Sequence, residues 1–162
     1  MTRSCPRAYL GAVGLLGLAL AGCAGSSENL TPQPAPPPPA MPATIQSDEV
    51  VGRWGLAAYH KEADRPRTET AARNQCKNPY VITKGPGGGL MMHLADQSQP
   101  QELRLKGGPG GKNYVGPTGP AGDMKDREIV SFDGRVLVLR WIDPEVAGRY
   151  GTGIYVRCAA RA

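Results

Sequence analysis

Apolar and polar side chains alternate along several short segments between residues 53 and 158. A period of two residues is typical of β-strands with one buried face, whereas a helical face repeats about every 3.6 residues. Glycine-rich turns separate these segments, for example Lys84–Gly89 and Lys106–Lys112. The pattern predicts about eight short strands: Arg53–Tyr59, Tyr80–Thr83, Leu90–Leu94, Gln101–Lys106, Lys112–Val115, Glu128–Phe132, Arg135–Trp141 and Gly153–Cys158.

The clearest hairpin is centred on Asp133 and Gly134. An Asp-Gly pair between two apolar runs favours a two-residue turn in which both central residues have positive φ. Such a turn makes Phe132 face Arg135 and places five side chains on one face, which we expect to point into the core: Val130, Phe132, Leu137, Leu139 and Trp141. The opposite face carries Ile129, Ser131, Val136, Val138 and Arg140, and it is apolar enough to need cover from another element or a partner.

One helix is expected at Pro66–Gln75, with a proline early in the segment and Asn78-Pro79 beyond its end. We therefore predict an all-β fold for residues 48–162, a small antiparallel barrel of roughly eight strands with one short helix. A half-open β-sandwich is the alternative.

The N-terminal residues 1–22 have the pattern of a secretory signal. Arg3 and Arg7 precede an apolar stretch, Ala8–Ala21, that is too short to span a membrane, because a spanning helix needs about 20 residues. The stretch ends in Leu20-Ala21-Gly22-Cys23, which resembles the lipobox of bacterial lipoproteins. The resemblance implies cleavage between Gly22 and Cys23 and acylation of Cys23 with chains such as palmitate. An ordinary secreted protein cleaved nearby is the alternative.

Residue 24 is alanine. In Gram-negative lipoproteins an aspartate there favours retention in the inner membrane, so the resemblance implies an outer-membrane anchor with the domain in the periplasm, or alternatively on the cell surface. Residues 23–47 then form a disordered tether, because seven of the residues 24–47 are proline, which favours extended chain. We expect a spacer; a proline-rich docking motif is the alternative.

Cysteine usage also indicates export. Cys5 leaves with the signal and Cys23 is acylated, so Cys76 and Cys158 remain in the mature domain. Two cysteines in an exported domain most simply form a disulfide. Two free thiols are the alternative, and a metal site is disfavoured because neither cysteine belongs to a Cys-x-x-Cys pair.

Charge and motifs limit the chemistry. Without the signal the chain has 17 basic and 14 acidic residues, a net charge of +3, and the basic residues are scattered, so we predict no nucleic-acid partner. The loop at Lys106–Lys112 lacks the glycine spacing of a phosphate-binding loop. His60 and His93 do not supply a metal-ligand set, and the acids near Asp123 and Asp143 fall in expected turns. We predict no enzymatic activity, no cofactor and no bound metal.

Gly52-Arg53-Trp54 resembles the opening of lipocalin-like barrels, and the chain's size resembles small envelope lipoproteins and periplasmic inhibitors of metalloproteases. The resemblance implies that Trp54 plugs the barrel base. The expected function is that of a membrane-anchored binding or structural module facing the periplasm, with an envelope protein or cell-wall component as partner. One alternative is an inhibitor of a protease or cell-wall hydrolase. Another is a carrier of a small apolar ligand, for which Trp54, Phe132, Leu137 and Trp141 leave little interior room.

Overall fold

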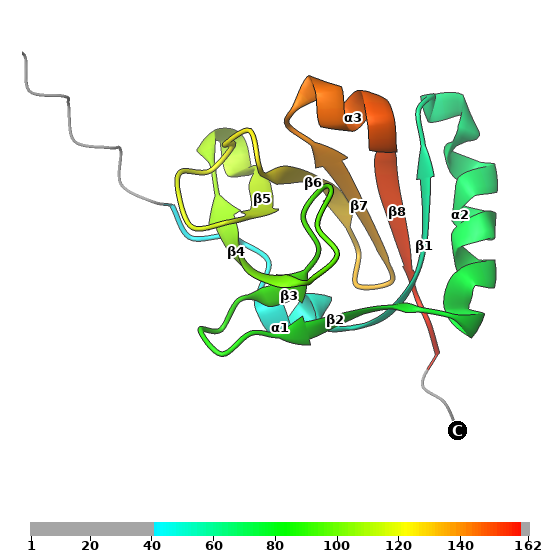
Figure 1. Cartoon of the computed structure of the whole chain (residues 1–162), viewed down its shortest axis with the longest axis horizontal. Coiled ribbons are helices and arrows are strands. Elements are labelled where there is room, and N and C mark those ends of the chain that lie inside the picture. The colour runs from blue at the N-terminus through cyan, green and yellow to red at the C-terminus, as the bar shows by residue number, and fades with distance from the viewer. Residues whose placement is uncertain (1–40, 160–162) are drawn as a thin grey trace, which may run out of the picture. The chain divides into compact units, whose positions relative to one another are not determined.

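The computed structural model describes residues 41–159. In this part of the chain eight strands form a closed antiparallel barrel in which each strand pairs with the next and the last pairs with the first (Figure 1). The predicted all-β barrel is confirmed, and the half-open sandwich is excluded. The strands are β1 (Gly52–Tyr59), β2 (Tyr80–Lys84), β3 (Leu90–Met92), β4 (Gln101–Gly107), β5 (Asn113–Gly116), β6 (Arg127–Phe132), β7 (Val136–Trp141) and β8 (Thr152–Arg157).

The β6–β7 hairpin has a longer loop than predicted. Phe132 lies opposite Leu137, and these two form the last facing pair before the loop. Four residues of the chain, 133–136, lie between them. The cause is Asp133, whose carboxylate accepts the backbone N–H of Arg135 at 2.8 Å and of Val136 at 2.7 Å. This local hydrogen bonding satisfies the loop backbone, as aspartate does in many turns. The expected two-residue turn with Phe132 facing Arg135 is therefore wrong.

A register shift at Val130 changes which residues of β6 face inward. Ile129 lies opposite Leu139, and the pairing is irregular between Ile129 and Ser131. The extra residue is Val130, whose side chain is 43% exposed, whereas Ile129 packs in the core with Leu137 and Leu139. The predicted inward position of Val130 and outward position of Ile129 are both wrong, because a β-bulge reverses the alternation beyond it.

Within residues 41–159 there are three α-helices, α1 (Ser47–Val50), α2 (Arg65–Asn74) and α3 (Pro144–Tyr150), and three short 3₁₀ helices, Glu62–Asp64, Gln75–Lys77 and Pro109–Gly111. The predicted helix is α2. The acids at Asp143 and Glu145 lie at the start of a helix and not in a turn: Asp143 accepts the N–H of Glu145 at 2.8 Å and of Val146 at 3.2 Å. Proline at the first helical position and an aspartate cap are a favourable helix start.

The main core fills the barrel from its α1 end. Its largest fully buried apolar side chains are Trp54, Ile82, Leu90, Met92, Leu103 and Leu137. Trp141 was expected to fill this core, but it is only half-buried and pairs with Arg127 at the far end of β7. The barrel interior is thus packed at the end near α1. At the other end Trp141 does not belong to the core cluster.

Helix α2 covers the outer face of β1 and β8 (Figure 1). A second apolar cluster lies beneath it: Tyr59, Ala72, Val138, Ile154 and Val156. The expectation that the face carrying Val136 and Val138 is covered is therefore confirmed. The helix approaches β1 closely at Gly55, where an added Cβ would lie 1.9 Å from the carbonyl oxygen of Ala72.

The chain before β1 also packs on the barrel. Met41 pairs with Gly107, and Thr44 hydrogen bonds in both directions with Asn113 at 2.8 Å. Residues 41–47, which the sequence assigns to the tether, are therefore held against β4 and β5. No helix in the described part of the chain is long and apolar enough to cross a membrane.

Candidate functional site

One end of the barrel is closed by Trp54. The ring is fully buried, and its Nε1–H donates to the carbonyl of Val50 at 3.0 Å. The guanidinium of Arg157, at the end of β8, lies 4.2 Å from the ring centroid and donates to the carbonyls of Val51 at 3.0 Å and Gly134 at 2.6 Å. These contacts join the segment that follows α1, the β6–β7 loop and β8 around the tryptophan.

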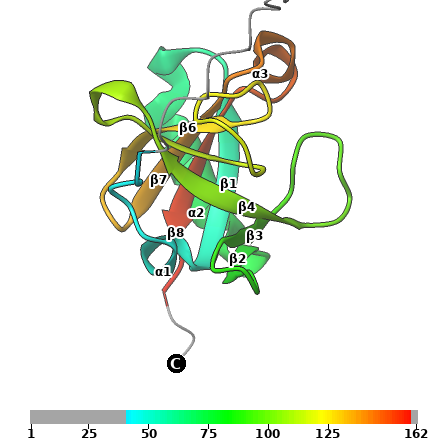
Figure 2. The same cartoon turned by 90° about the vertical axis from the view of Figure 1, so that its left-hand side faces the viewer.

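The other end carries α3 and the loop between β3 and β4, whose courses can be followed in Figures 1 and 2. Residues of both line a cavity there. This cavity of about 320 Å³ has aromatic walls from Tyr80, Trp141, Tyr150 and Tyr155. An adjoining cavity of about 280 Å³ shares Leu94 and Trp141 with it and is lined further by Met124 and Val146. Both linings mix apolar and polar side chains, with Gln97 common to the two cavities and Gln101 and Asp143 in the smaller one. Concave hollows of this size that combine aromatic walls with polar groups are typical of small-molecule sites.

Arg127 is the unusual residue of this hollow. Its side chain lines the cavity, yet the residue is only 3% exposed. Its guanidinium carbon lies 4.9 Å from the ring centroid of Trp141, and its Nη2 contacts the Sδ of Met92 at 4.0 Å. Its Nε–H is buried without a hydrogen-bond partner, and it makes no ion pair with any residue of the range 41–159. Because an arginine keeps its charge in proteins, Arg127 is a buried cation without a counter-ion in the part of the chain that the structure describes.

Two tyrosines and a histidine stand beside Arg127. The hydroxyl of Tyr80 accepts the backbone N–H of His93 at 2.9 Å and lies 3.2 Å from the Nδ1 of that histidine. The ring of Tyr80 meets that of Tyr155 at 5.7 Å between centroids. Burial raises the pKa of Tyr155, and the charge of Arg127 opposes that rise. Tyr155 therefore keeps its proton at neutral pH and remains a hydrogen-bond donor.

Asp96 holds the β3–β4 loop against α3. Its carboxylate accepts two hydrogen bonds from Arg149, at 3.1 and 2.8 Å, and another from the hydroxyl of Tyr150. The bond from Tyr150, and then those from Arg149, lower the pKa of Asp96. The loop backbone adapts at the same residue, where Asp96 has a φ of +58°. The negative charge of Asp96 is thus neutralised by α3 and does not serve Arg127.

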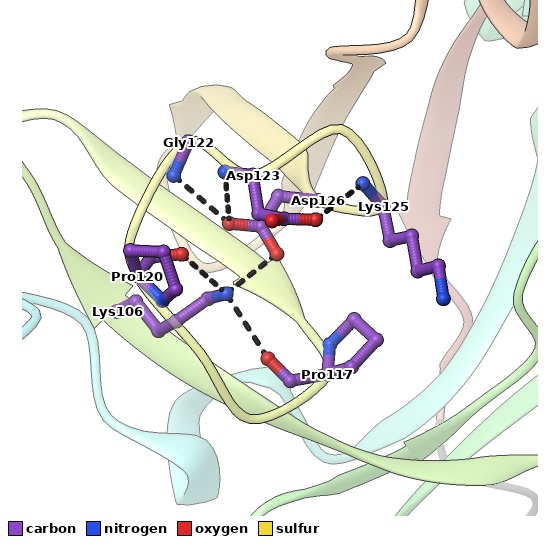
Figure 3. A network of polar contacts seen from close by, with 7 residues as sticks. All are labelled: Lys106, Pro117, Pro120, Gly122, Asp123, Lys125 and Asp126. Carbon is purple, nitrogen blue, oxygen red and sulfur yellow. Dashed lines mark hydrogen bonds and ion pairs between the residues drawn. The ribbon is translucent and has the colours of Figure 1, made fainter.

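The residue before Arg127 is also buried and charged, but it is fully paired (Figure 3). The carboxylate of Asp126 is 0% exposed and lies 2.6 Å from the ammonium of Lys106. The further contacts of this pair are the N–H groups of Gly122 and Asp123 and the carbonyls of Pro117 and Pro120. The network fastens the loop between β5 and β6 and fixes the point at which β6 begins. Asp126 is thus paired with Lys106, and no ion pair joins it or any other acid of residues 41–159 to Arg127.

The site residues predicted from sequence have different outcomes. Cys76 and Cys158 form a disulfide, with their Cα atoms 5.5 Å apart. Trp54 lies at the closed end, whereas Gly22 and Cys23 lie outside the described residues. No three His, Cys, Asp or Glu side chains of residues 41–159 converge as metal ligands.

Arg127 was missed by the sequence analysis. The predicted strand began at Glu128, which left Arg127 in the preceding loop. Extending the alternation by one residue would have placed Arg127 on the face of Ile129, which was expected to point outward and to carry Arg140 as well. The pattern therefore offered no signal for Arg127, because only the bulge at Val130 turns Ile129 and Arg127 inward.

Comparison with known proteins finds no matching family model, no matching curated protein and no matching solved structure.

Proposed function

We propose that this protein is a lipid-anchored, non-enzymatic binding protein of the cell envelope, whose barrel takes a small ligand at its open end. The observation that carries the proposal is the contrast between the two barrel ends. At one end Trp54 is fully buried under the guanidinium of Arg157, while the other end keeps a hollow of about 320 Å³ with aromatic walls. A wider cavity of about 610 Å³ also borders Arg157, but its walls are mostly polar and charged side chains and the disulfide, without an aromatic ring. A small ligand, or the end of a larger one, fits such a hollow better than a flat protein surface does.

The anchor and the location are supported by sequence and by covalent structure. Cys23 follows a lipobox-like motif, and proline-rich chain separates it from the barrel. The Cys76–Cys158 disulfide supports an oxidising compartment, since such bonds persist in exported proteins and are rare in the cytosol. With Ala24 after the anchor, we place the lipid in the outer membrane and the barrel in the periplasm.

Binding is favoured over catalysis by the state of the acidic groups at the open end. Asp96 is taken up by Arg149 and Tyr150, and Asp143 caps α3. A general acid or base must be able to exchange a proton with a substrate. Two carboxylates committed to the protein's own hydrogen bonds are poorly suited to that role.

The anchor is tested by metabolic labelling of the full chain with a palmitate analogue in a Gram-negative host. The wild-type protein should carry the label and fractionate with the outer membrane. Cys23→Ser should lose the label, whereas Cys5→Ser is the matched control and should keep it, because Cys5 leaves with the signal. Labelling of Cys23→Ser, or an unlabelled wild-type protein, would show the anchor proposal to be wrong.

Ligand binding is tested on residues 23–162, with Cys23→Ser to keep the protein out of the membrane. The uncharged probe N-phenyl-1-naphthylamine, which fluoresces in apolar sites, should bind saturably. Trp141→Leu should weaken this binding, and Val81→Ala, on an exposed position of β2, should leave it unchanged. If binding is absent, or if Trp141→Leu binds as the wild type does, the open end is not a ligand site.

A further inference from the structure

We propose that Arg127 is an anion-recognising residue and that the ligand carries an oxyanion group, a carboxylate, sulfonate or phosphate, on a flat apolar body. The inference rests on the proposed function, because it names the ligand class of the same open end. The observation behind it is a buried guanidinium that lines a cavity and has no counter-ion within residues 41–159.

Two arginines of this barrel stand on tryptophans at opposite ends and can be compared directly. Arg157 lies over Trp54 and donates to backbone carbonyls of Val51 and Gly134. Arg127 lies over Trp141, and its side-chain contacts in the described chain are the thioether of Met92 at 4.0 Å and the uncharged hydroxyl of Tyr155, while its Nε–H has no partner. Arg157 therefore has backbone carbonyl acceptors, whereas Arg127 has only weak or uncharged ones and one N–H left unpaired. The missing acceptors are what an anionic ligand would supply.

The neighbouring charges strengthen this assignment. The buried Asp126 has Lys106 at 2.6 Å, and Asp96 has Arg149 at 2.8 Å, so neither carboxylate is left for Arg127. A buried charge without a partner costs several kcal/mol, which an incoming opposite charge would recover. The planar fork of a guanidinium matches an oxyanion with two oxygens. The hydroxyl of Tyr155 offers a further donor on the cavity wall.

The apolar body has room beside the anion. The adjoining cavity of about 280 Å³ shares Trp141 and Leu94 with the Arg127 cavity. Met124 and Val146 supply further apolar wall, and one charge of each sign also lines this cavity, Lys125 and Asp143. The carboxylate of Asp143 is engaged by the backbone N–H groups at the start of α3. A flat ring system attached to the oxyanion would therefore lie against the indole while the charged group reaches the guanidinium.

The test compares two fluorescent probes that differ by one sulfonate: 8-anilinonaphthalene-1-sulfonate and uncharged N-phenyl-1-naphthylamine. Both are titrated into the Cys23→Ser chain described above. The wild type should prefer the sulfonate. Arg127→Met should weaken sulfonate binding by about tenfold or more while changing affinity for the uncharged probe by less than about twofold, since only the charge-assisted hydrogen bonds are removed. Arg127→Lys should restore part of the preference. The control Lys77→Met removes an exposed positive charge that lines neither cavity, and it should retain the preference.

Folding is checked separately. Arg127→Met should melt at or above the wild-type temperature in anion-poor buffer, because it removes an uncompensated buried charge. If this variant does not fold, the Nε–H resonance of Arg127 in the wild type provides a second measurement, and it should shift when sodium 1-naphthoate is added.

The outcomes separate the two proposals. Failure of both probes to bind the wild type saturably refutes the proposed function itself. Saturable binding with equal losses for both probes in Arg127→Met, or with no loss, refutes only the role of Arg127, as does an unmoved Nε–H resonance. Displacement of the sulfonate probe by 1-naphthoate indicates a free small anion, whereas displacement by phosphatidylglycerol vesicles alone indicates a lipid headgroup. Displacement by neither counts against an oxyanion ligand.

Discussion

Asp126 and Arg127 are neighbours in the chain and both are almost completely buried, but they meet different surroundings. The carboxylate of Asp126 has an ammonium and two backbone N–H groups, while the guanidinium of Arg127 has an aromatic ring and a thioether. At the scale of single residues, Asp126 therefore contributes to stability, and Arg127 is the residue that we propose binds a ligand. The pair at Asp126 also fixes the backbone that presents Arg127.

Replacing Asp126 with asparagine should lower the free energy of unfolding by about 3 kcal/mol, because Lys106 would stay buried without its counter-charge. Urea denaturation measures this. The matched control is Asp48→Asn, which breaks an ion pair of similar length, 2.7 Å, between Asp48 and Lys84, whose side chains are 71% and 53% exposed. The control should lose at most about 1 kcal/mol. Equal losses would show that burial does not decide the value of the Lys106 pair.

At the scale of elements, the alternation of apolar residues predicts all eight strands and proline placement predicts α2, because both signals are local. The bulge at Val130 is not local, since it depends on how the Asp133 loop sets the register of the partner strand. Helix α3 did have a signal, an Asp143-Pro144 start and a glycine after its end, but these residues also suit turns. The candidate site was predicted least well, because it unites residues from β2, β6, β7 and β8.

Gly55 marks the place where α2 touches β1. Gly55→Ala should lower the free energy of unfolding by about 1 to 3 kcal/mol, because the new methyl would lie 1.9 Å from the carbonyl oxygen of Ala72 and would push the helix outward. Thermal and urea unfolding would report the loss. Gly148→Ala in α3 is the control, because an added Cβ there meets no atom within 4 Å. A variant at Gly55 as stable as this control would contradict the close packing.

Glu128 and Arg140 face each other across β6 and β7, with their side chains 2.6 Å apart. The hydrogen bond from Arg140, and then that from Lys112, lower the pKa of Glu128. A lowered folded-state pKa contributes stability that is present above the unfolded pKa of about 4.3 and is lost as the pH falls through the folded value. Unfolding measured from pH 6 to pH 3 should therefore show a shallower acid decline in Glu128→Gln than in the wild type. Parallel declines would exclude this contribution.

At the scale of the whole molecule, the barrel closes where β1 meets β8. Trp54 lies opposite Arg157 in this pairing, and α2 covers the join from outside. The disulfide holds the same region covalently, because Cys76 follows α2 and Cys158 follows β8. Sequence counting predicted the bond, but its role at the junction of the first and last strands became visible only in the fold.

The double variant Cys76→Ala/Cys158→Ala, in the Cys23→Ser chain, should lower the free energy of unfolding by about 4 kcal/mol, since a bond across 82 residues restricts the unfolded chain strongly. Guanidinium denaturation without reductant provides the comparison. Reduction of the parent chain should produce the same loss. A loss that occurs in the variant but not on reduction would point to packing around the sulfur atoms instead.

The closure of β1 on β8 has a consequence for the order in which the chain is made. Strands β2 to β7 each pair with a strand already synthesised, but the second side of β1 stays uncovered until residues 152–157 have been made. Until then both β1 and β7 present open edges, which are templates for pairing with another chain. A protein that is truncated or cleaved before β8 should therefore aggregate through β1 and β7. The six residues of β8 prevent this by covering both open edges.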